Sequence, residues 1–283
     1  MATYKEIKGT QIEAVSSDPS NPVEGQMWYN STSGQLKGHI KVLSGSWASG
    51  GTLNTSPGRF QLGGAGTQTA ALAFGGGTQW PGVGITDATE SYNGTNWTEV
   101  NNLNTSRRNL TGLGLQTAAL GFGGGPPAKD LTETWNGTNW TEVNDLNTAR
   151  YGLAASGTST SALGFGGSVS PGGETELWNG TNWTEVNDLN TGSREGAGGF
   201  GASNTSALCA GAAAGGNVEE WNGTNWTEVA DLSTAVYNPG PTQSGTTSLG
   251  AIFGGFSPPG IVPLKTTEEW TGPTDTTVTF TDS

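Results

Sequence analysis

The sequence predicts an all-β fold made of repeated four-stranded units, and two observations carry that prediction. The motif WNGTNWTEVNDLNT, at residues 178–191, recurs nearly unchanged at 92–105, 135–148 and 221–234, so that successive copies are 43 residues apart. Glycine-rich segments such as ALGFGG (119–124) recur between the copies. A fixed period of this length is typical of solenoids and propellers, in which each repeat is one supersecondary unit.

The composition agrees with a folded chain rich in turns. The 283 residues include 48 glycines but also 11 tryptophans and 8 phenylalanines, which a disordered chain would lack. The net charge of −13 argues against nucleic acid and anionic membranes as partners, and no apolar run is long enough for a membrane span. With Cys209 and His39 as the single cysteine and histidine, we expect no disulfide within the chain, no metal site and no cofactor.

Each repeat predicts four short strands. In the repeat that begins at residue 151, the expected strands are 151–157, 161–167, 175–179 and 182–186. The third and fourth strands are joined by Asn-Gly, which is the strongest short signal for a β-hairpin because both residues accept a positive φ.

The two ends of the repeated region each carry half a repeat. Trp47 stands six residues before Leu53, which is the spacing of Trp97 and Leu103 in a full repeat. EEWTG (268–272) matches the third strand, but no fourth-strand motif follows it. The N-terminal half therefore supplies the strand that the C-terminal half lacks.

This complementation predicts a closed ring, namely a five-bladed β-propeller over residues 46–272 whose last blade is completed by residues 46–50. Closure removes the exposed edges that an open array leaves. A β-solenoid is the alternative, but its coils do not predict complementary ends. Residues 1–45 form a separate N-terminal segment, and residues 273–283 a C-terminal tail.

The order of FGG, a variable loop, an aromatic residue, NW and then arginine resembles the kelch repeat. The resemblance extends over residues 46–272 and implies a kelch-like propeller. These repeats are shorter than the kelch norm, and five is a low number for that family.

The N-terminal segment predicts a small β-hairpin, with the strand-like runs QMWYN and QLKGHIKV around STSG. It resembles a short segment that is common in bacteriophage tail-fibre and other virion proteins. The residues that carry this pattern are Pro22, Gly25, Trp28, Tyr29, Asn30, Thr32, Gly34, Leu36 and Lys37. The resemblance implies a virion protein made in the host cytoplasm, with other virion proteins as partners and a possible homo-oligomeric state. Trp28, Tyr29 and Leu36 are the docking residues that we expect.

The residues that could do chemistry favour a non-enzymatic protein. Glu99, Glu142, Glu185 and Glu228 recur once per blade, whereas glycoside hydrolysis needs two unlike carboxylates roughly 5–9 Å apart. The first strands of the repeats, such as YGLAASG, contain no carboxylate. A single histidine outside the blades supplies neither a copper site nor a catalytic triad. The recurring Trp97, Trp140, Trp183 and Trp226 are expected in the core between blades.

Function is expected where the repeats differ. In a four-stranded meander, the links between repeats emerge on the same face as the loops between second and third strands. Loops on a rigid frame often carry recognition. The expected binding residues on this face are Trp80, Pro81, Arg107, Arg150, Arg194, Pro258, Pro259 and Lys265.

These observations favour a bacteriophage virion protein, of a tail fibre, spike or other surface part, that displays a propeller for recognition of a host-surface glycan or protein. One alternative is a carbohydrate-binding propeller lectin or adhesin outside a virion. The other is a propeller glycoside hydrolase, which the distribution of carboxylates disfavours.

Overall fold

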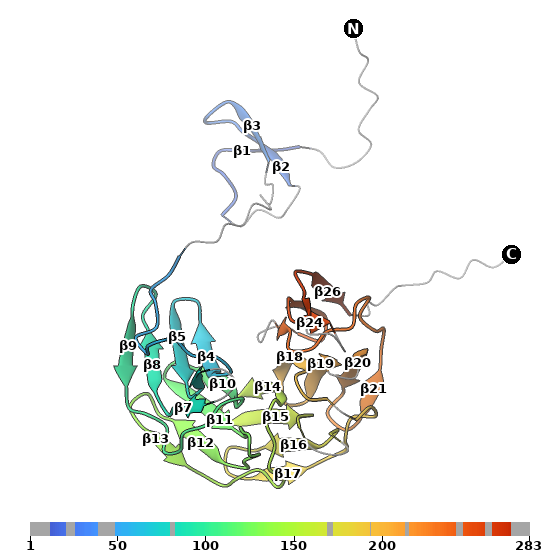
Figure 1. The fold of residues 1–283 in the computed structure, drawn as a ribbon. Coiled ribbons are helices and arrows are strands. Elements are labelled where there is room, and N and C mark those ends of the chain that lie inside the picture. The colour runs from blue at the N-terminus through green and yellow to red at the C-terminus, as the bar shows by residue number, and fades with distance from the viewer. Residues whose placement is uncertain are drawn as a thin grey trace, which may run out of the picture. The chain divides into compact units, whose positions relative to one another are not determined.

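The computed structural model describes residues 12–20, 26–38, 49–79, 83–168, 172–192, 194–212, 215–241, 246–257 and 262–272. The chain divides into two compact units, Met1–Ser49 and Gly50–Ser283. Every regular element within these described ranges is a β-strand (Figure 1). In this part of the chain no helix is long and apolar enough to cross a membrane.

The larger unit contains four antiparallel sheets of four strands each, which follow one another along the chain as predicted. We call them blades one to four. The strands of each blade are given from the innermost to the outermost. Blade one contains β4 (Gly63–Thr67), β5 (Ala70–Phe74), β8 (Thr89–Tyr92) and β9 (Trp97–Val100), and blade two contains β10 (Thr111–Leu115), β11 (Ala118–Phe122), β12 (Thr132–Trp135) and β13 (Trp140–Glu142). Blade three contains β14 (Ala154–Thr158), β15 (Ser161–Phe165), β16 (Thr175–Trp178) and β17 (Trp183–Glu185), and blade four contains β18 (Gly198–Ser203), β19 (Ser206–Ala212), β20 (Gly215–Trp221) and β21 (Trp226–Glu228).

A fifth sheet contains β22 (Gly240–Pro241), β23 (Leu249–Phe253) and β26 (Thr267–Thr271) in that order. It corresponds to the first three strands of a blade. Residues 46–50 are predicted to form its fourth strand. Since residues 41–48 lie outside the described part of the chain, this remains a prediction.

Two small hairpins lie in the loops between second and third strands. They are β6 (Gly77–Gln79) with β7 (Val83–Ile85) in blade one, and β24 (Phe256–Ser257) with β25 (Val262–Pro263) in the fifth sheet. These loops are longer than their equivalents in the other blades.

The innermost strands surround a common axis. In Figure 1 the blades follow one another along a curve, with β10 and β14 on its inner side and β13 and β17 on its outer side. A cavity of about 170 Å³ is lined by residues from all five sheets, among them Gly63, Gly112, Ala154, Gly199 and Pro241. Glycine and alanine dominate this lining because the strands approach most closely at the axis.

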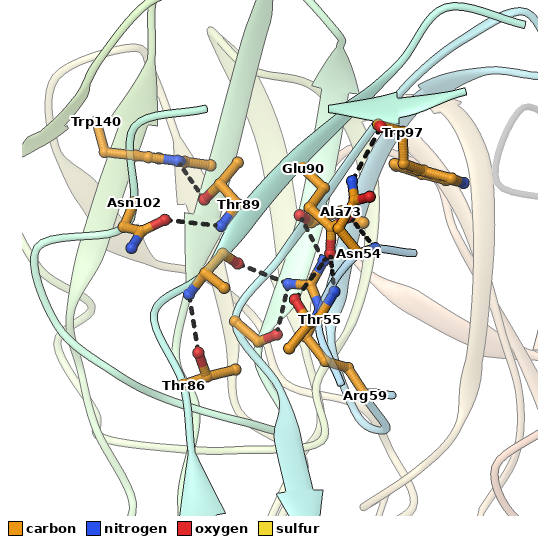
Figure 2. A network of polar contacts seen from close by, with 12 residues as sticks. Asn54, Thr55, Arg59, Ala73, Thr86, Thr89, Glu90, Trp97, Asn102 and Trp140 are labelled. Carbon is orange, nitrogen blue, oxygen red and sulfur yellow. Dashed lines mark hydrogen bonds and ion pairs between the residues drawn. The ribbon is translucent and has the colours of Figure 1, made fainter. Parts of the chain in front are cut away.

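Neighbouring blades are joined by a tryptophan of one blade and two residues of the blade before it. Trp140, from the outermost strand of blade two, has its ring centroid 4.7 Å from that of Phe74 in blade one. Its Nε1–H donates to Thr89 Oγ1 over 3.0 Å, as Figure 2 shows. The same contacts join Trp183 to Phe122 and Thr132, and Trp226 to Phe165 and Thr175. The prediction that the recurring tryptophans belong to the core between blades is confirmed for Trp140, Trp183 and Trp226, and we call each such contact a Trp–Phe–Thr lock. Trp97, for which the same was predicted, is only half-buried.

The N-terminal unit contains the predicted hairpin of β2 (Met27–Asn30) and β3 (Gln35–Gly38), together with a parallel strand, β1 (Glu13–Val15), that the sequence did not predict. Asp18 accepts hydrogen bonds from Lys37 Nζ, Asn30 Nδ2 and Trp28 Nε1. These donors, Lys37 foremost, hold the pKa of Asp18 well below its usual range. The loop that carries Asp18 is therefore bonded to side chains of both β2 and β3.

Candidate functional site

The links between blades interleave with the loops between second and third strands on one face of the propeller, which we call the loop face. In the link between blades two and three, the Arg150 carbonyl accepts from Gly124 N–H over 2.9 Å, and Arg150 N–H donates to the Lys129 carbonyl over 3.0 Å. Gly124 and Lys129 belong to the loop of blade two. Ser168, from the loop of blade three, donates its N–H to the Tyr151 carbonyl. Links and loops thus share a face, as the strand order predicts.

The arginines of the links were expected on this face, but their side chains are buried. Those of Arg107, Arg150 and Arg194 are at most 1% exposed, and each forms an ion pair with a glutamate of the third strand. The four pairs of this kind are Arg59–Glu90 (2.9 Å), Arg107–Glu133 (3.0 Å), Arg150–Glu176 (2.8 Å) and Arg194–Glu219 (2.7 Å). The expectation of surface exposure is therefore wrong, because these guanidinium groups hold the link against the blade.

Each glutamate holds the link at several points. In blade two, Glu133 accepts the backbone N–H and the side-chain amide of Asn104, at 2.8 and 2.9 Å, as well as Arg107 Nη2. Figure 2 shows the equivalent network in blade one, where Asn54, Thr55 and Arg59 surround Glu90. The asparagine and the arginine of the repeated LNT…R motif thus bind the same glutamate, and these bonds fix the position of the link.

The charge of these arginines is retained despite burial. Burial lowers the pKa of Arg107, and the carboxylate of Glu133 partly offsets this effect. An arginine remains protonated under such shifts because its ordinary pKa is so high. Arg107 Nη1 also donates to the carbonyls of Gly123 and Leu131, at 3.0 and 2.6 Å, which further compensates its burial.

The fifth sheet departs from this pattern. Val236 occupies the position of the arginine, and Glu268 accepts only backbone N–H groups of the link, those of Ser233 (2.8 Å) and Thr234 (3.0 Å), among the hydrogen bonds of the described residues. The last link is therefore held without an ion pair.

A backbone chain of hydrogen bonds connects the links around the axis. One residue in each link has a positive φ of 52–66° in the left-handed region, and these residues are Gln61, Asn109, Gly152, Gly196 and Asn238. The N–H of each donates to the carbonyl of the preceding one, from Asn109 to Gln61 over 2.7 Å and so on to Asn238 and Gly196 over 2.8 Å. Glycine and asparagine suit these positions because they adopt the left-handed conformation at low cost.

The residue before each left-handed position varies between blades, with four residue types at the five positions. These residues are Phe60, Arg108, Tyr151, Glu195 and Tyr237, and we call them the loop-face ring. They lie one position after Arg59, Arg107, Arg150, Arg194 and Val236, respectively. A repeated frame thus carries four kinds of side chain at five equivalent places.

Neighbouring members of the ring contact one another. The Arg108 guanidinium lies 5.9 Å from the centroid of the Phe60 ring, and its Nη1 donates to Gln61 Oε1 over 2.9 Å. The Tyr237 hydroxyl donates to Glu195 Oε1 over 3.2 Å. Burial, reinforced by the Glu195 carboxylate, raises the pKa of Tyr237, so that its hydroxyl remains a donor. All five side chains except that of Arg108 are half-buried and so partly accessible; Arg108 is more than nine-tenths buried.

This set combines three aromatic rings with one cation and one carboxylate. Aromatic faces bind apolar surfaces such as the C–H face of a sugar ring, while the partly accessible Glu195 supplies a charged acceptor. The sequence indicated this face, but the link arginines that it indicated are buried in ion pairs. The signal that was missed is that the position after each arginine varies while its neighbours repeat.

The remaining predicted site residues are placed as follows. Trp80, Pro81, Pro258 and Pro259 lie outside the described residues. Lys265 is exposed and follows β25, in the loop whose Phe256 exchanges backbone hydrogen bonds with Tyr237. In the N-terminal sheet, Tyr29 and Leu36 are exposed on one face, whereas Trp28 is 6% exposed and points to the opposite face, toward Asp18. Trp28 is therefore a core residue of the unit and not a docking residue.

Comparison with known proteins bears on the fold. No protein-family model matches the sequence, and neither does any curated protein sequence. Among solved structures, one similar chain is that of the kelch-repeat β-propeller protein YjhT, with a TM-score of 0.64 and 13% sequence identity over 80% of this chain and 85% of that one. The fold is that of a kelch-like β-propeller. At this identity the likeness concerns the fold alone.

Proposed function

We propose that this chain is a non-enzymatic bacteriophage virion protein. In this proposal the N-terminal sheet docks onto the particle, and the loop face of the propeller binds a glycan or protein of the host surface. The observation that carries it is the loop-face ring, in which four kinds of side chain occupy the five equivalent positions of a repeated frame. The resemblance of the N-terminal motif to a segment of virion proteins is the reason for proposing that the chain is part of a phage particle.

The disposition of the carboxylates supports binding and not hydrolysis. Those of the third strands, such as Glu133 and Glu176, are held in buried ion pairs. Those of the fourth strands, such as Glu142 and Glu185, are exposed and belong to different blades. Glu195 of the loop-face ring accepts a hydrogen bond from Tyr237, which suits a fixed acceptor.

The N-terminal sheet supports docking through one apolar face. Tyr29 and Leu36 are direct cross-strand partners, with 42% and 56% of their surfaces exposed. Met27 and Ile12 are also about half exposed, and alternation along the strands places Met27 on the face of Tyr29. A three-stranded sheet this small gains stability when such a face is covered, so that attachment to a larger assembly is favourable.

The binding proposal is tested by Glu195→Gln on the loop face. This change removes the charge without changing the shape, and we expect the purified protein to bind intact host cells at least ten-fold less tightly, about 1.4 kcal/mol of binding free energy. Glu185→Gln, on the exposed outermost strand of blade three, is the matched control and is expected to bind normally. Equal binding by both variants, with unchanged thermal unfolding, would overturn the assignment of the loop face. Release of sugar products during the assay would instead favour the hydrolase.

The docking proposal is tested by the double change Tyr29→Ser and Leu36→Ser. We expect particles assembled with this variant to carry much less of the chain, as measured by quantitative mass spectrometry of purified phage. Leu115→Ser, which alters an exposed leucine of the propeller, is the control and should be incorporated normally. Normal incorporation of the double variant would contradict docking through this face, and absence of the unaltered chain from particles would favour the free lectin or adhesin.

A further inference from the structure

Glu195, in the link between blades three and four, is a half-buried carboxylate without a cation beside it. The third-strand glutamates Glu176 and Glu219 are paired with link arginines, whereas none of the ion pairs among the described residues includes Glu195. The residues of the loops on this face that fall outside the described ranges contain no lysine or arginine. A carboxylate that has lost part of its hydration is stabilised by a nearby positive charge, so that Glu195 can accept a cation from outside the chain.

Two glycines make room for Glu195 and Tyr237 on the loop face. The left-handed positions of the links before them are Gly152 and Gly196, whereas the other links carry larger residues there. A Cβ at residue 196 would lie 2.5 Å from Tyr237 Cε2, and a Cβ at residue 152 would lie 3.1 Å from Glu195 Cγ. The Tyr237 ring and the Glu195 side chain therefore lie directly over the backbone of the preceding link, beside the axis.

Tyr151 and Tyr237 are the neighbours of Glu195 in the loop-face ring. The Tyr237 hydroxyl donates to Glu195 Oε1 over 3.2 Å, and among the described residues it is the only donor to this carboxylate, so that Oε2 is left for a ligand. Tyr151 is close enough to contribute to the raised pKa of Tyr237, after burial and the Glu195 carboxylate. Both tyrosines are half-buried, so that part of each side chain is accessible beside the carboxylate.

We infer that Glu195, Tyr151 and Tyr237 bind the ammonium group of an amino sugar. The ammonium donates to Glu195 Oε2, while the C–H face of the sugar packs on a tyrosine ring, whose face also attracts the positive charge. The net charge of −13 favours the approach of a cationic ligand over that of an anionic one. This assignment rests on the proposed function and names the class of host glycan that the loop face binds.

An amino sugar fits this site better than a lysine side chain does. The sugar carries its ammonium directly on a rigid ring, so that the charge and the apolar C–H face are presented together to the neighbouring carboxylate and aromatic rings. A lysine presents its ammonium at the end of a flexible stem, and binding it costs more side-chain entropy. The combination of Glu195 with two tyrosines therefore favours the sugar.

The site is tested by calorimetric titration of the full chain with glucosamine. N-acetylglucosamine is the matched control ligand, because it has the same ring but a neutral nitrogen substituent. In slightly acidic buffer, in which the amine of glucosamine is protonated, we expect glucosamine to bind at least ten-fold more tightly than N-acetylglucosamine. Equal affinity for the two sugars, or no binding of glucosamine, would overturn the assignment.

Glu195→Gln separates binding of a ligand from a purely structural role. The amide oxygen can still accept from the Tyr237 hydroxyl, so that we expect unchanged thermal unfolding but at least ten-fold weaker binding of glucosamine. Glu185→Gln removes a carboxylate from the exposed outermost strand of blade three, and this control should bind glucosamine normally. Undiminished binding by Glu195→Gln would show that the charge of Glu195 does not hold the ammonium group.

Two further comparisons separate the source of the ammonium group and the proposed function. Tighter binding of Nα-acetyl-lysine than of glucosamine would overturn the assignment to a sugar. Loss of host-cell binding in Glu195→Gln, without a preference for glucosamine over N-acetylglucosamine, would overturn the ammonium site and leave the proposed function intact. Normal host-cell binding by Glu195→Gln, together with a clear preference for glucosamine, would overturn the proposed function and leave the ammonium site.

Discussion

Arg107→Ala is expected to lower the free energy of unfolding by about 3–5 kcal/mol, because it leaves Glu133 buried without its cation. Glu133 is fully buried and accepts Arg107 Nη2 over 3.0 Å. The measurement is equilibrium unfolding in urea, followed by tryptophan fluorescence. Lys265→Ala, which removes an exposed cation, is the control and should change stability by less than about 0.5 kcal/mol.

A second variant separates the burial of charge from the loss of packing. Adding Glu133→Gln to Arg107→Ala removes the orphaned charge, while the remaining amide oxygen can still accept the N–H of Asn104, which Glu133 binds over 2.8 Å. We expect the double variant to be more stable than Arg107→Ala alone. If the double variant were the less stable of the two, the buried charge would not be the cause of the loss.

Trp183→Ala is expected to cost about 3–5 kcal/mol of folding free energy, the range observed when a large buried aromatic side chain is truncated. The change removes the ring that packs 4.8 Å from Phe122, and it leaves the hydroxyl of Thr132 without its donor. Since Trp183 joins blades two and three, the loss weakens the junction between them as well as the blade itself.

The milder change Trp183→Phe separates the two contributions. It keeps an aromatic ring but removes the N–H, and we expect it to cost about 1 kcal/mol from the hydrogen bond together with a smaller packing loss. Denaturant unfolding of both variants gives the comparison. Equal losses for Trp183→Ala and Trp183→Phe would contradict the view that ring packing dominates the lock.

Much of the fold could be predicted because local signals repeat. The expected third strand 175–179 is observed as Thr175–Trp178, and the expected fourth strand 182–186 as Trp183–Glu185. The Asn-Gly turns between them form as expected, with Asn179 Oδ1 accepting the N–H groups of Thr181 and Asn182 and Gly180 at a φ of 92°. Hairpins of this kind are determined by residues close in sequence, so that the sequence alone suffices.

The first strands were predicted less accurately. Residues 151–157 were expected in blade three, but the strand runs from Ala154 to Thr158. The preceding residues belong to the link, where Tyr151 and Gly152 form hydrogen bonds with a loop and with the next left-handed residue. Those bonds depend on neighbouring blades and are not visible in the local pattern.

The role of the link arginines could not be read from arginine positions alone. Arg150 and Glu176 are 26 residues apart, and only the assembled blade brings them within 2.8 Å. The sequence did hold a signal, since Glu90, Glu133, Glu176 and Glu219 recur with the same period as the motif. The glutamates of the fourth strands recur with that period as well, so the period alone does not show which series meets the arginines.

One contact near the start of the propeller agrees with the prediction that a fourth strand precedes Asn54. Asn54 donates its backbone N–H to Glu90 over 2.6 Å, which corresponds to the contact of Asn104 with Glu133 over 2.8 Å. Residues near Asn54 thus behave as a link that follows an earlier fourth strand. The assignment of residues 46–50 to that strand stays a prediction.

The most direct test of the proposed function is an electron cryo-microscopy map of the intact phage particle at a resolution that places single side chains. We predict that the N-terminal sheet contacts the particle through Tyr29 and Leu36, and that Tyr151, Glu195 and Tyr237 of the loop-face ring face the solvent. A particle without density for this chain, or a propeller attached to the particle through its loop face, would contradict the proposal.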